Sequence, residues 1–404
     1  MRIRRRNART YLDSAAGVSG NPSSPHAEGR AAREELERSR VAIARLVEAK
    51  PDDVLFTSGA TEANALAILG TMRAARSAGG AGLRPHALYW PGSHASIVEN
   101  MKLAAREGAV VEPLPVAACR VDCDALAKLV CPETVLISLE AVDGETGVVW
   151  NTREVARIVD ATRRQRRFIA PSGSGSAFEQ PVADKSPLPA RPLLHVDASQ
   201  AVWTENLTRA HFAADLLTLD ASKVSLARGI GALVAPRKVP LAPLYAGGGQ
   251  ERGLVPGSEA PALAAAFAEG LARAAAGRET FRAAALAARE KLIATIYATV
   301  PGALVNESPR AQAPNVLNLS LPGRDTDYLV ALLDEAGFAA STKSACESAS
   351  GEGSRAVLAL SGDPERAAAT LRISWGRETH ARDLDRFAAA LARAVAFVDS
   401  NGAE

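Results

Sequence analysis

Apolar and polar positions along the first two-thirds of the chain form blocks of two kinds. Short apolar runs, such as residues 54–57 (VLFT) and 86–90 (HALYW), predict buried strands. Longer stretches with helical spacing lie between them, and this alternation predicts parallel strands joined by crossover helices. Further strands are expected at 110–114, 134–139, 193–196, 216–219 and 231–235, and helices at 34–48, 60–72, 96–107 and 152–163.

This pattern predicts an α/β fold with a doubly wound, mostly parallel sheet, whose ligands lie beyond the carboxyl ends of the strands. It is interrupted at residues 164–192, where a composition rich in Pro, Ser and Gly predicts an exposed, mobile loop. Residues 262–300 predict a long alanine-rich helix, and strands near 315–320 and 369–374 follow it. We therefore expect a large α/β domain over 13–262 and a smaller α+β domain formed by 263–404 together with 1–12.

Composition is compatible with this division. A chain of 404 residues is long enough for two domains, and 47% apolar with 23% charged residues is typical of a folded protein. The net charge of +2 creates no overall field for nucleic acid or anionic lipid, so we expect neither as a partner. Because no apolar run has the length of a signal peptide or a transmembrane helix, we expect a cytoplasmic protein.

The cysteines fall into two groups. Cys119, Cys123 and Cys131 have neither the spacing nor the neighbouring histidines of a zinc site, so we expect buried thiols and no metal. Cys346 lies in the polar, small-residue stretch 341–354, a context typical of an exposed, reactive thiol. An incidental free thiol is the alternative interpretation.

Candidate cofactor chemistry lies at the ends of three predicted strands. Residues 56–64 (FTSGATEAN) form a strand-to-helix turn whose free N–H groups can bind an anion, although an ordinary capped turn has the same composition. Asp197 ends a later strand and can hold a positively charged ring nitrogen. Lys223 follows the next strand and is a candidate for covalent attachment of a carbonyl cofactor. A solvated acid and a solvated lysine are the alternatives.

Taken together, these segments resemble the cysteine desulfurases of the long-loop group that serves iron–sulfur cluster assembly, within the class V aminotransferase-like, fold-type I pyridoxal-phosphate enzymes. The resemblance implies pyridoxal 5′-phosphate as the cofactor and conversion of L-cysteine to L-alanine, with the sulfur left on Cys346 as a persulfide. Matching segments run nearly end to end: 11–16 (YLDSAA), 20–26 (GNPSSPH), 57–64, 93–98 (SHASIV), 196–200 (VDASQ), 247–253 (GGGQERG), 344–348 (SACES) and 371–377 (LRISWGR).

The resemblance also implies a role for each matched position. Lys223, His94 and Cys346 are the catalytic residues: the lysine holds the cofactor and removes the substrate's α-proton, the histidine stacks on the ring, and the cysteine receives sulfur. Asp197 keeps the ring nitrogen protonated, and Arg372 clamps the substrate carboxylate. The other cofactor-binding positions are Ala60 and Thr61 at the phosphate, Gln200 at the ring oxygen, Ser222 beside the lysine, and Ser258 at the phosphate of a second subunit.

Partners follow from the same resemblance. The persulfide must reach a sulfur-acceptor protein, such as an iron–sulfur scaffold, and the reach of Ser258 into a second subunit implies a homodimer. Two alternatives stay open: another pyridoxal-phosphate lyase that does not need Cys346, such as a selenocysteine lyase, and a non-catalytic paralogue that acts as a partner or scaffold.

Several positions depart from the family pattern. An asparagine of the family is missing at Asp143-Gly144, and the family's Ser-x-His-Lys becomes Asp220-Ala-Ser222-Lys223. Asp220 puts a carboxylate where a hydroxyl meets the phosphate, so we expect weaker cofactor retention. Val255 stands where arginine is common, the segment between 16 and 21 is shorter than usual, and the loop 164–192 is longer.

Overall fold

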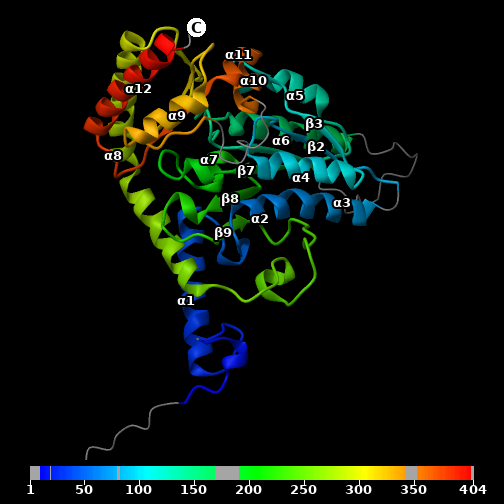
Figure 1. Ribbon diagram of the computed structural model, residues 1–404. Helices are drawn as coiled ribbons and strands as arrows, with labels where there is room; N and C mark the ends of the chain where they lie inside the picture. Colours follow the sequence, from blue (N-terminus) through cyan, green and yellow to red (C-terminus); the bar gives the residue numbers. More distant parts are fainter. Residues whose placement is uncertain (1–9, 19, 80–81, 169–190, 343–352, 402–404) are drawn as a thin grey trace, which may run out of the picture.

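The main sheet has seven strands (Figure 1), in a computed structural model that describes residues 10–18, 20–79, 82–168, 191–342 and 353–401. The strand order is β1-β9-β8-β7-β6-β2-β3. The strands are β1 Val54–Thr57, β2 His86–Tyr89, β3 Val110–Pro113, β6 Thr134–Glu140, β7 Leu193–Asp197, β8 Leu216–Asp220 and β9 Gly231–Val234.

The predicted mostly parallel sheet is confirmed, with one exception. Strands β3, β2, β6, β7 and β8 pair in parallel, whereas β9 is antiparallel to both β8 and β1. The connection from β8 to β9 covers only residues 221–230, which is too short for a crossover helix, so β9 must return in the opposite direction.

Helices cover both faces of this sheet because alternate side chains of each strand point to opposite sides. Val54 and Phe56 join one core, whereas Leu55 joins the other. The first core is covered by α1 Ala27–Leu46, α5 Cys123–Leu129, α6 Thr152–Phe168 and the beginning of α8 Pro261–Thr299. The second is covered by α2 Ala60–Ala65, a π-helical turn Leu66–Gly70, α3 Thr71–Gly79 and α4 Ala95–Arg106.

A smaller antiparallel sheet lies beside the first, and α8 belongs to both cores (Figure 1). Phe267 and Leu271, near the start of α8, pack in the core of the large sheet, while Leu292 and Ile296 pack in the core of the small one. The small sheet comprises β10 Leu304–Val305, β11 Val316–Ser320 and β12 Thr370–Ser374, with α9 Thr326–Glu335 and α12 Ala381–Asn401. The predicted domain boundary at 262 lies at the start of α8. The division of the chain into two domains stays a prediction.

Some local expectations were wrong. Helix α1 begins at Ala27, earlier than the predicted residue 34, because His26 acts as its N-cap and accepts a hydrogen bond from the Gly29 amide (3.2 Å). Helix α6 continues to Phe168, so residues 164–168 of the predicted loop are helical, and 169–190 lie outside the described residues. The hairpin of β4 Val116–Ala117 and β5 Arg120–Val121 and the short helices α7 Arg209–Phe212, α10 Arg355–Ser361 and α11 Pro364–Ala368 were not predicted.

The structure also bears on two expectations about environment: the burial of three cysteines and the absence of a membrane-spanning helix. Cys119, Cys123 and Cys131 are half-buried, and not buried as predicted, because they lie in and around the exposed β4–β5 hairpin and α5. Over the described ranges, no helix is long and apolar enough to cross a membrane. The cytoplasmic location stays a prediction.

Candidate active site

A cavity of about 450 Å³ opens at the carboxyl ends of β6, β7 and β8. These strands end in Glu140, Asp197 and Asp220, which all line the cavity. This is the edge where an open α/β sheet binds its ligands. The predicted residues that meet here are Ala60, Thr61, His94, Asp197, Gln200, Ser222, Lys223 and Arg372.

Asp197 is buried, and both of its carboxylate oxygens are held in place. The Asn64 side chain donates to Oδ2 (2.7 Å), and the Ser199 amide donates to Oδ1 (2.9 Å). The Asn64 amide group also donates to the Ser96 hydroxyl (2.9 Å) and is itself fully buried on α2. A carboxylate oriented in this way suits a cationic ring N–H. Asn64 was not predicted as a site residue, although it ends the matched segment 57–64.

His195 on β7 links the neighbouring strands β6 and β8 through its side chain. Its imidazole contacts the Ser138 hydroxyl on β6 (2.8 Å) and the Thr218 hydroxyl on β8 (3.0 Å). Complete burial lowers the pKa of His195 from 6.5 to about 4, against the opposing pull of Asp197. The neutral ring therefore acts as a fixed bridge, and it keeps the ends of β6, β7 and β8 in register.

His94 precedes α4 and caps it. Its Nδ1 accepts from the Ser96 amide (3.2 Å) and contacts the Ser96 hydroxyl (2.8 Å). The same hydroxyl accepts from Asn64, so one chain of hydrogen bonds joins His94 to Asp197. One edge of the imidazole is thus fixed where the ring lines the cavity.

Buried acids to which the sequence assigned no role form one wall. Glu140 Oε1 accepts from the His94 amide (3.3 Å), whereas Oε2 is buried with no hydrogen-bond partner among the described residues. Burial, together with Asp143, Asp197 and Glu145, raises the pKa of Glu140 well above its usual 4.5. Burial also raises the pKa of Asp143, opposed by its hydrogen bonds from Thr146 and Glu145. The available signal was a charged residue at the end of the mostly apolar strand 134–140.

The missing family asparagine has a structural counterpart at Gly144. A Cβ at this position would lie 3.1 Å from Gln200 Nε2, so the Gln200 side chain fills the space that a larger residue needs. The Gly144 carbonyl accepts from Arg372 Nη1 (3.3 Å), which brings the arginine of the small sheet to the cavity of the large one.

Lys223 ends a short helical turn, Ala221–Lys223, directly after β8. Its carbonyl accepts from Trp203 Nε1 (2.7 Å), which fixes the backbone at the turn, and its side chain lines the cavity. The ring end of a pyridoxal cofactor therefore fits the residues present: a lysine, an oriented carboxylate, Gln200 and His94.

The phosphate end does not fit in the same way. Asp220 Oδ2 accepts from the Ala60 amide (3.0 Å), the group predicted to bind phosphate, and Oδ1 accepts from the Ser222 amide (2.7 Å). Arg252, which lies in the matched segment 247–253, donates to the carbonyls of Asp52 and Ala235. A carboxylate of the chain therefore takes the place expected for the phosphate.

Ser258 and Val255 lie outside this cavity. Ser258 is exposed and lines a separate hollow of about 260 Å³ with residues of the N-terminal segment, including Gly17 and Asn21. Val255 is half-buried and packs against the apolar core on the α2–α4 face of the sheet. Neither residue contacts the predicted cofactor site of its own chain.

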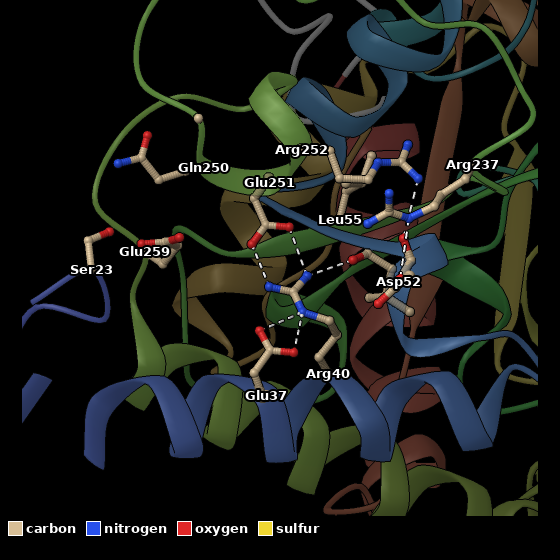
Figure 2. Close-up of a pocket in the computed structure, with 12 residues that line it drawn as sticks. Ser23, Glu37, Arg40, Asp52, Leu55, Arg237, Gln250, Glu251, Arg252 and Glu259 are labelled. Atoms are coloured by element: carbon tan, nitrogen blue, oxygen red, sulfur yellow. Dashed lines mark hydrogen bonds and ion pairs between the residues drawn. The ribbon is translucent and has the colours of Figure 1, made fainter. Parts of the chain in front are cut away.

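Figure 2 shows a third pocket, of about 380 Å³, around a buried ion pair. Arg40 Nη2 on α1 pairs with Glu251 Oε1 (2.7 Å), and Glu251 Oε2 accepts from the Phe56 amide (3.0 Å). Glu251 and Arg252 both have left-handed backbone, with φ of 46° and 62°. The pair holds this strained turn, which belongs to the matched segment 247–253 and leads to Ser258.

Cys346 lies outside the described residues. The chain enters its segment beside the cavity, since Ser341 pairs with Arg372 across an antiparallel bridge and its amide donates to the Arg372 carbonyl (3.3 Å). On the far side, the buried Ser354 caps α10 by accepting from the Val357 amide (3.0 Å).

Comparison with known proteins gives the family. The model of the aminotransferase class-V family matches residues 6–168 and 189–387. The chain belongs to this family. It is 30% identical to cysteine desulfurase IscS 1 of Archaeoglobus fulgidus, over 91% of this chain and 87% of that protein. Cysteine desulfurase NifS of Azotobacter vinelandii is also 30% identical, with 91% and 83% covered.

Solved structures agree with the fold. A NifS-like protein superposes with a TM-score of 0.79 at 24% identity, covering 94% of this chain and 92% of that one. The predicted resemblance to cysteine desulfurases and the predicted fold-type I architecture are therefore confirmed.

Proposed function

We propose that this protein is a pyridoxal-phosphate-dependent cysteine desulfurase, which converts L-cysteine to L-alanine and transfers the sulfur to Cys346. The observation that carries the proposal is the meeting of Lys223, Asp197 and Arg372 in one cavity, although they come from two different sheets. A lysine, a ring-nitrogen partner and a carboxylate clamp are together what an amino-acid reaction on a pyridoxal cofactor requires.

The residues of the chain divide the chemistry between them. When bound, the pyridoxal ring supplies an electron sink for charge that develops at the substrate's Cα. Asp197 holds the ring nitrogen, with its own oxygens fixed by Asn64 and Ser199. Lys223 holds the cofactor and moves the α-proton, and Arg372 orients the substrate carboxylate through its planar guanidinium.

Sulfur transfer balances without an outside oxidant. The thiolate sulfur of Cys346 attacks the substrate sulfur, an S–S bond forms, and the C–S bond of the substrate breaks. The substrate carbon is reduced and takes up a proton to give L-alanine, while Cys346 becomes a persulfide. The bridge between Ser341 and Arg372 supports this role, because it places Ser341, five residues before Cys346 in the sequence, next to the residue that binds the substrate carboxylate.

Delivery to a sulfur-acceptor protein, such as an iron–sulfur scaffold, and a homodimeric state belong to the same proposal. Leu12 and Val18 are 90% and 97% exposed on the N-terminal segment, which projects away from both sheets beyond the end of α1 (Figure 1). A second copy of the chain would cover these side chains. Ser258, outside its own cavity, is then available to the partner. Light scattering on the purified protein tests this, and a monomer would contradict it.

The central test is incubation with L-cysteine, followed by an alanine assay and mass analysis of the Cys346 peptide. We expect alanine and a persulfide from the unmodified protein, no alanine from Lys223→Ala, and no persulfide from Cys346→Ala. Lys238→Ala and Cys123→Ala are matched controls that should leave both products unchanged. Absence of alanine and persulfide in the unmodified protein would overturn the proposal.

The same variants separate the alternatives. A lyase that does not use Cys346, such as a selenocysteine lyase, would keep turning over in Cys346→Ala. A non-catalytic paralogue is favoured by one observation, the occupation of the Ala60 amide by Asp220. Visible absorbance of bound cofactor that disappears in Lys223→Ala would argue against it.

A further inference from the structure

The anion position at the start of α2 is closed by an acid from the chain itself. Asp220 makes one hydrogen bond with each carboxylate oxygen, to the Ala60 amide (3.0 Å) and to the Ser222 amide (2.7 Å). Both donors belong to residues that the resemblance assigns to the cofactor. A backbone N–H has one proton to give, so neither amide can serve Asp220 and a phosphate fully at the same time.

The backbone conformation brings Asp220 and the start of α2 close together. Gly231 of β9 pairs with Asp220 on one side and with Thr57 on the other, which places the start of α2 beside the end of β8. A Cβ on Gly231 would lie 2.7 Å from the Gly59 carbonyl carbon, so only glycine permits this approach. Gly59 has a φ of +149°, and a Cβ on it would lie 3.6 Å from Asp220 Oδ2.

Charge opposes a phosphate at the same place. Asp143, Glu145 and Asp197 also line the cavity, and the basic side chains there are Lys223, Arg228 and Arg372. In the proposed function, Lys223 binds the cofactor and Arg372 binds the substrate carboxylate. Adding a phosphate next to Asp220 brings like charges within a few ångströms, which disfavours binding.

We propose that the Asp220 carboxylate stands in for the cofactor phosphate, so that the pocket selects the pyridoxal ring and draws little affinity from the phosphate group. The inference rests on the proposed function, because it takes a pyridoxal cofactor as given. Phosphate-free pyridoxal and pyridoxal 5′-phosphate should therefore bind with similar affinity. A phosphate must displace Asp220 from Ala60 before it gains that hydrogen bond.

The test is a binding titration of the full-length apo-protein with pyridoxal and with pyridoxal 5′-phosphate, followed by visible absorbance. The two dissociation constants should differ by less than about threefold in the unmodified protein. In Asp220→Ser, the phosphorylated form should bind about ten- to a hundredfold more tightly, the range that a charged hydrogen bond contributes. Pyridoxal affinity should change little.

Asp325→Ser is the matched control, because Asp325 also caps a helix by accepting from the Tyr328 amide (3.0 Å), but on α9. It should leave both constants unchanged. If the unmodified protein already prefers the phosphorylated form by a hundredfold and Asp220→Ser adds nothing, the inference fails and the proposed function stands. If neither compound is trapped on Lys223 by borohydride in any variant, the proposed function fails, and the inference fails with it.

Discussion

At the scale of single residues, the site depends on a few buried polar side chains that hold the reactive groups in place. Asn64, Ser96 and His94 form one hydrogen-bonded chain that ends on Asp197. The family resemblance assigned roles to His94 and Asp197, whereas it assigned none to Asn64, although Asn64 ends the matched segment 57–64, and none to Glu140. A side chain whose role is to orient another leaves no periodic pattern in the sequence.

Asn64→Leu should weaken cofactor binding about tenfold, because Asp197 loses the donor to Oδ2 and no longer holds the ring nitrogen in one orientation. The cofactor dissociation constant measures this. Asn306→Leu is a matched control: the buried Asn306 also donates to two side chains, Asn318 and Ser320 (both 2.7 Å), but in the small sheet. Similar loss of affinity in both variants would mean that general destabilisation is the cause.

Glu140 should make the protein less stable as the pH rises. Its folded-state pKa is raised above the usual 4.5, so the folded protein binds more protons than the unfolded chain above that pH. The free energy of unfolding therefore falls from about pH 4.5 upward through the folded pKa. Glu140→Gln keeps the shape and removes the titration, so urea unfolding between pH 5 and 8 should show a shallower slope.

Glu154→Gln provides the comparison for this experiment. The Arg120 guanidinium lowers the pKa of Glu154, so its contribution to stability is lost only when the pH falls below the usual range of a carboxyl group. The slope between pH 5 and 8 should stay that of the unmodified protein. An unchanged slope in Glu140→Gln would show that Glu140 is ionised in the fold.

At the scale of elements, the contact between β9 and the start of α2 depends on one glycine. The strand runs that the sequence predicted are nearly those of the structure, because each is a short apolar block between polar turns. The pattern of apolar and polar positions did not predict the antiparallel direction of β9 or the early start of α1. The first follows from the short connection after β8, and the second from a histidine that caps a helix.

Gly231→Ala should lower the free energy of unfolding by about 1–3 kcal/mol, because the new methyl group meets backbone atoms of Gly59 and Leu219 that have little room to move. It should also separate α2 from β8 and weaken cofactor binding. Gly376→Ala is the control, since a Cβ there meets nothing within 4 Å. Chemical denaturation of the two variants decides the matter, and equal stability would contradict the close approach.

At the scale of the whole molecule, distant parts of the chain are joined by a buried ion pair. Arg40 and Glu251 lie on α1 and on the strained turn before Ser258, and both side chains are buried (Figure 2). The sequence placed residues 247–253 in a family segment but gave no sign of their partner on α1. Two residues so far apart in the sequence follow no regular spacing, so their pairing could not be predicted.

Arg40→Met should cost about 3–5 kcal/mol of unfolding free energy, because Glu251 is left as a buried charge without its cation. The double variant Arg40→Met with Glu251→Gln should cost less than the sum of the two single changes. Lys291→Met, which breaks an exposed pair with Asp385 (2.7 Å), should cost less than about 1 kcal/mol. Strictly additive costs in the Arg40 and Glu251 cycle would contradict the coupling.

Helix α8 has a consequence for the width of the cavity. Its 39 residues make a rod of about 58 Å, at about 1.5 Å per residue, with one end set in each core. Lys223 follows β8 of the large sheet, and Arg372 lies on β12 of the small one. Because side chains of α8 pack in both cores, this single helix fixes how far apart the two sheets lie. The separation of Lys223 and Arg372 across the cavity therefore depends on the straightness and length of one helix.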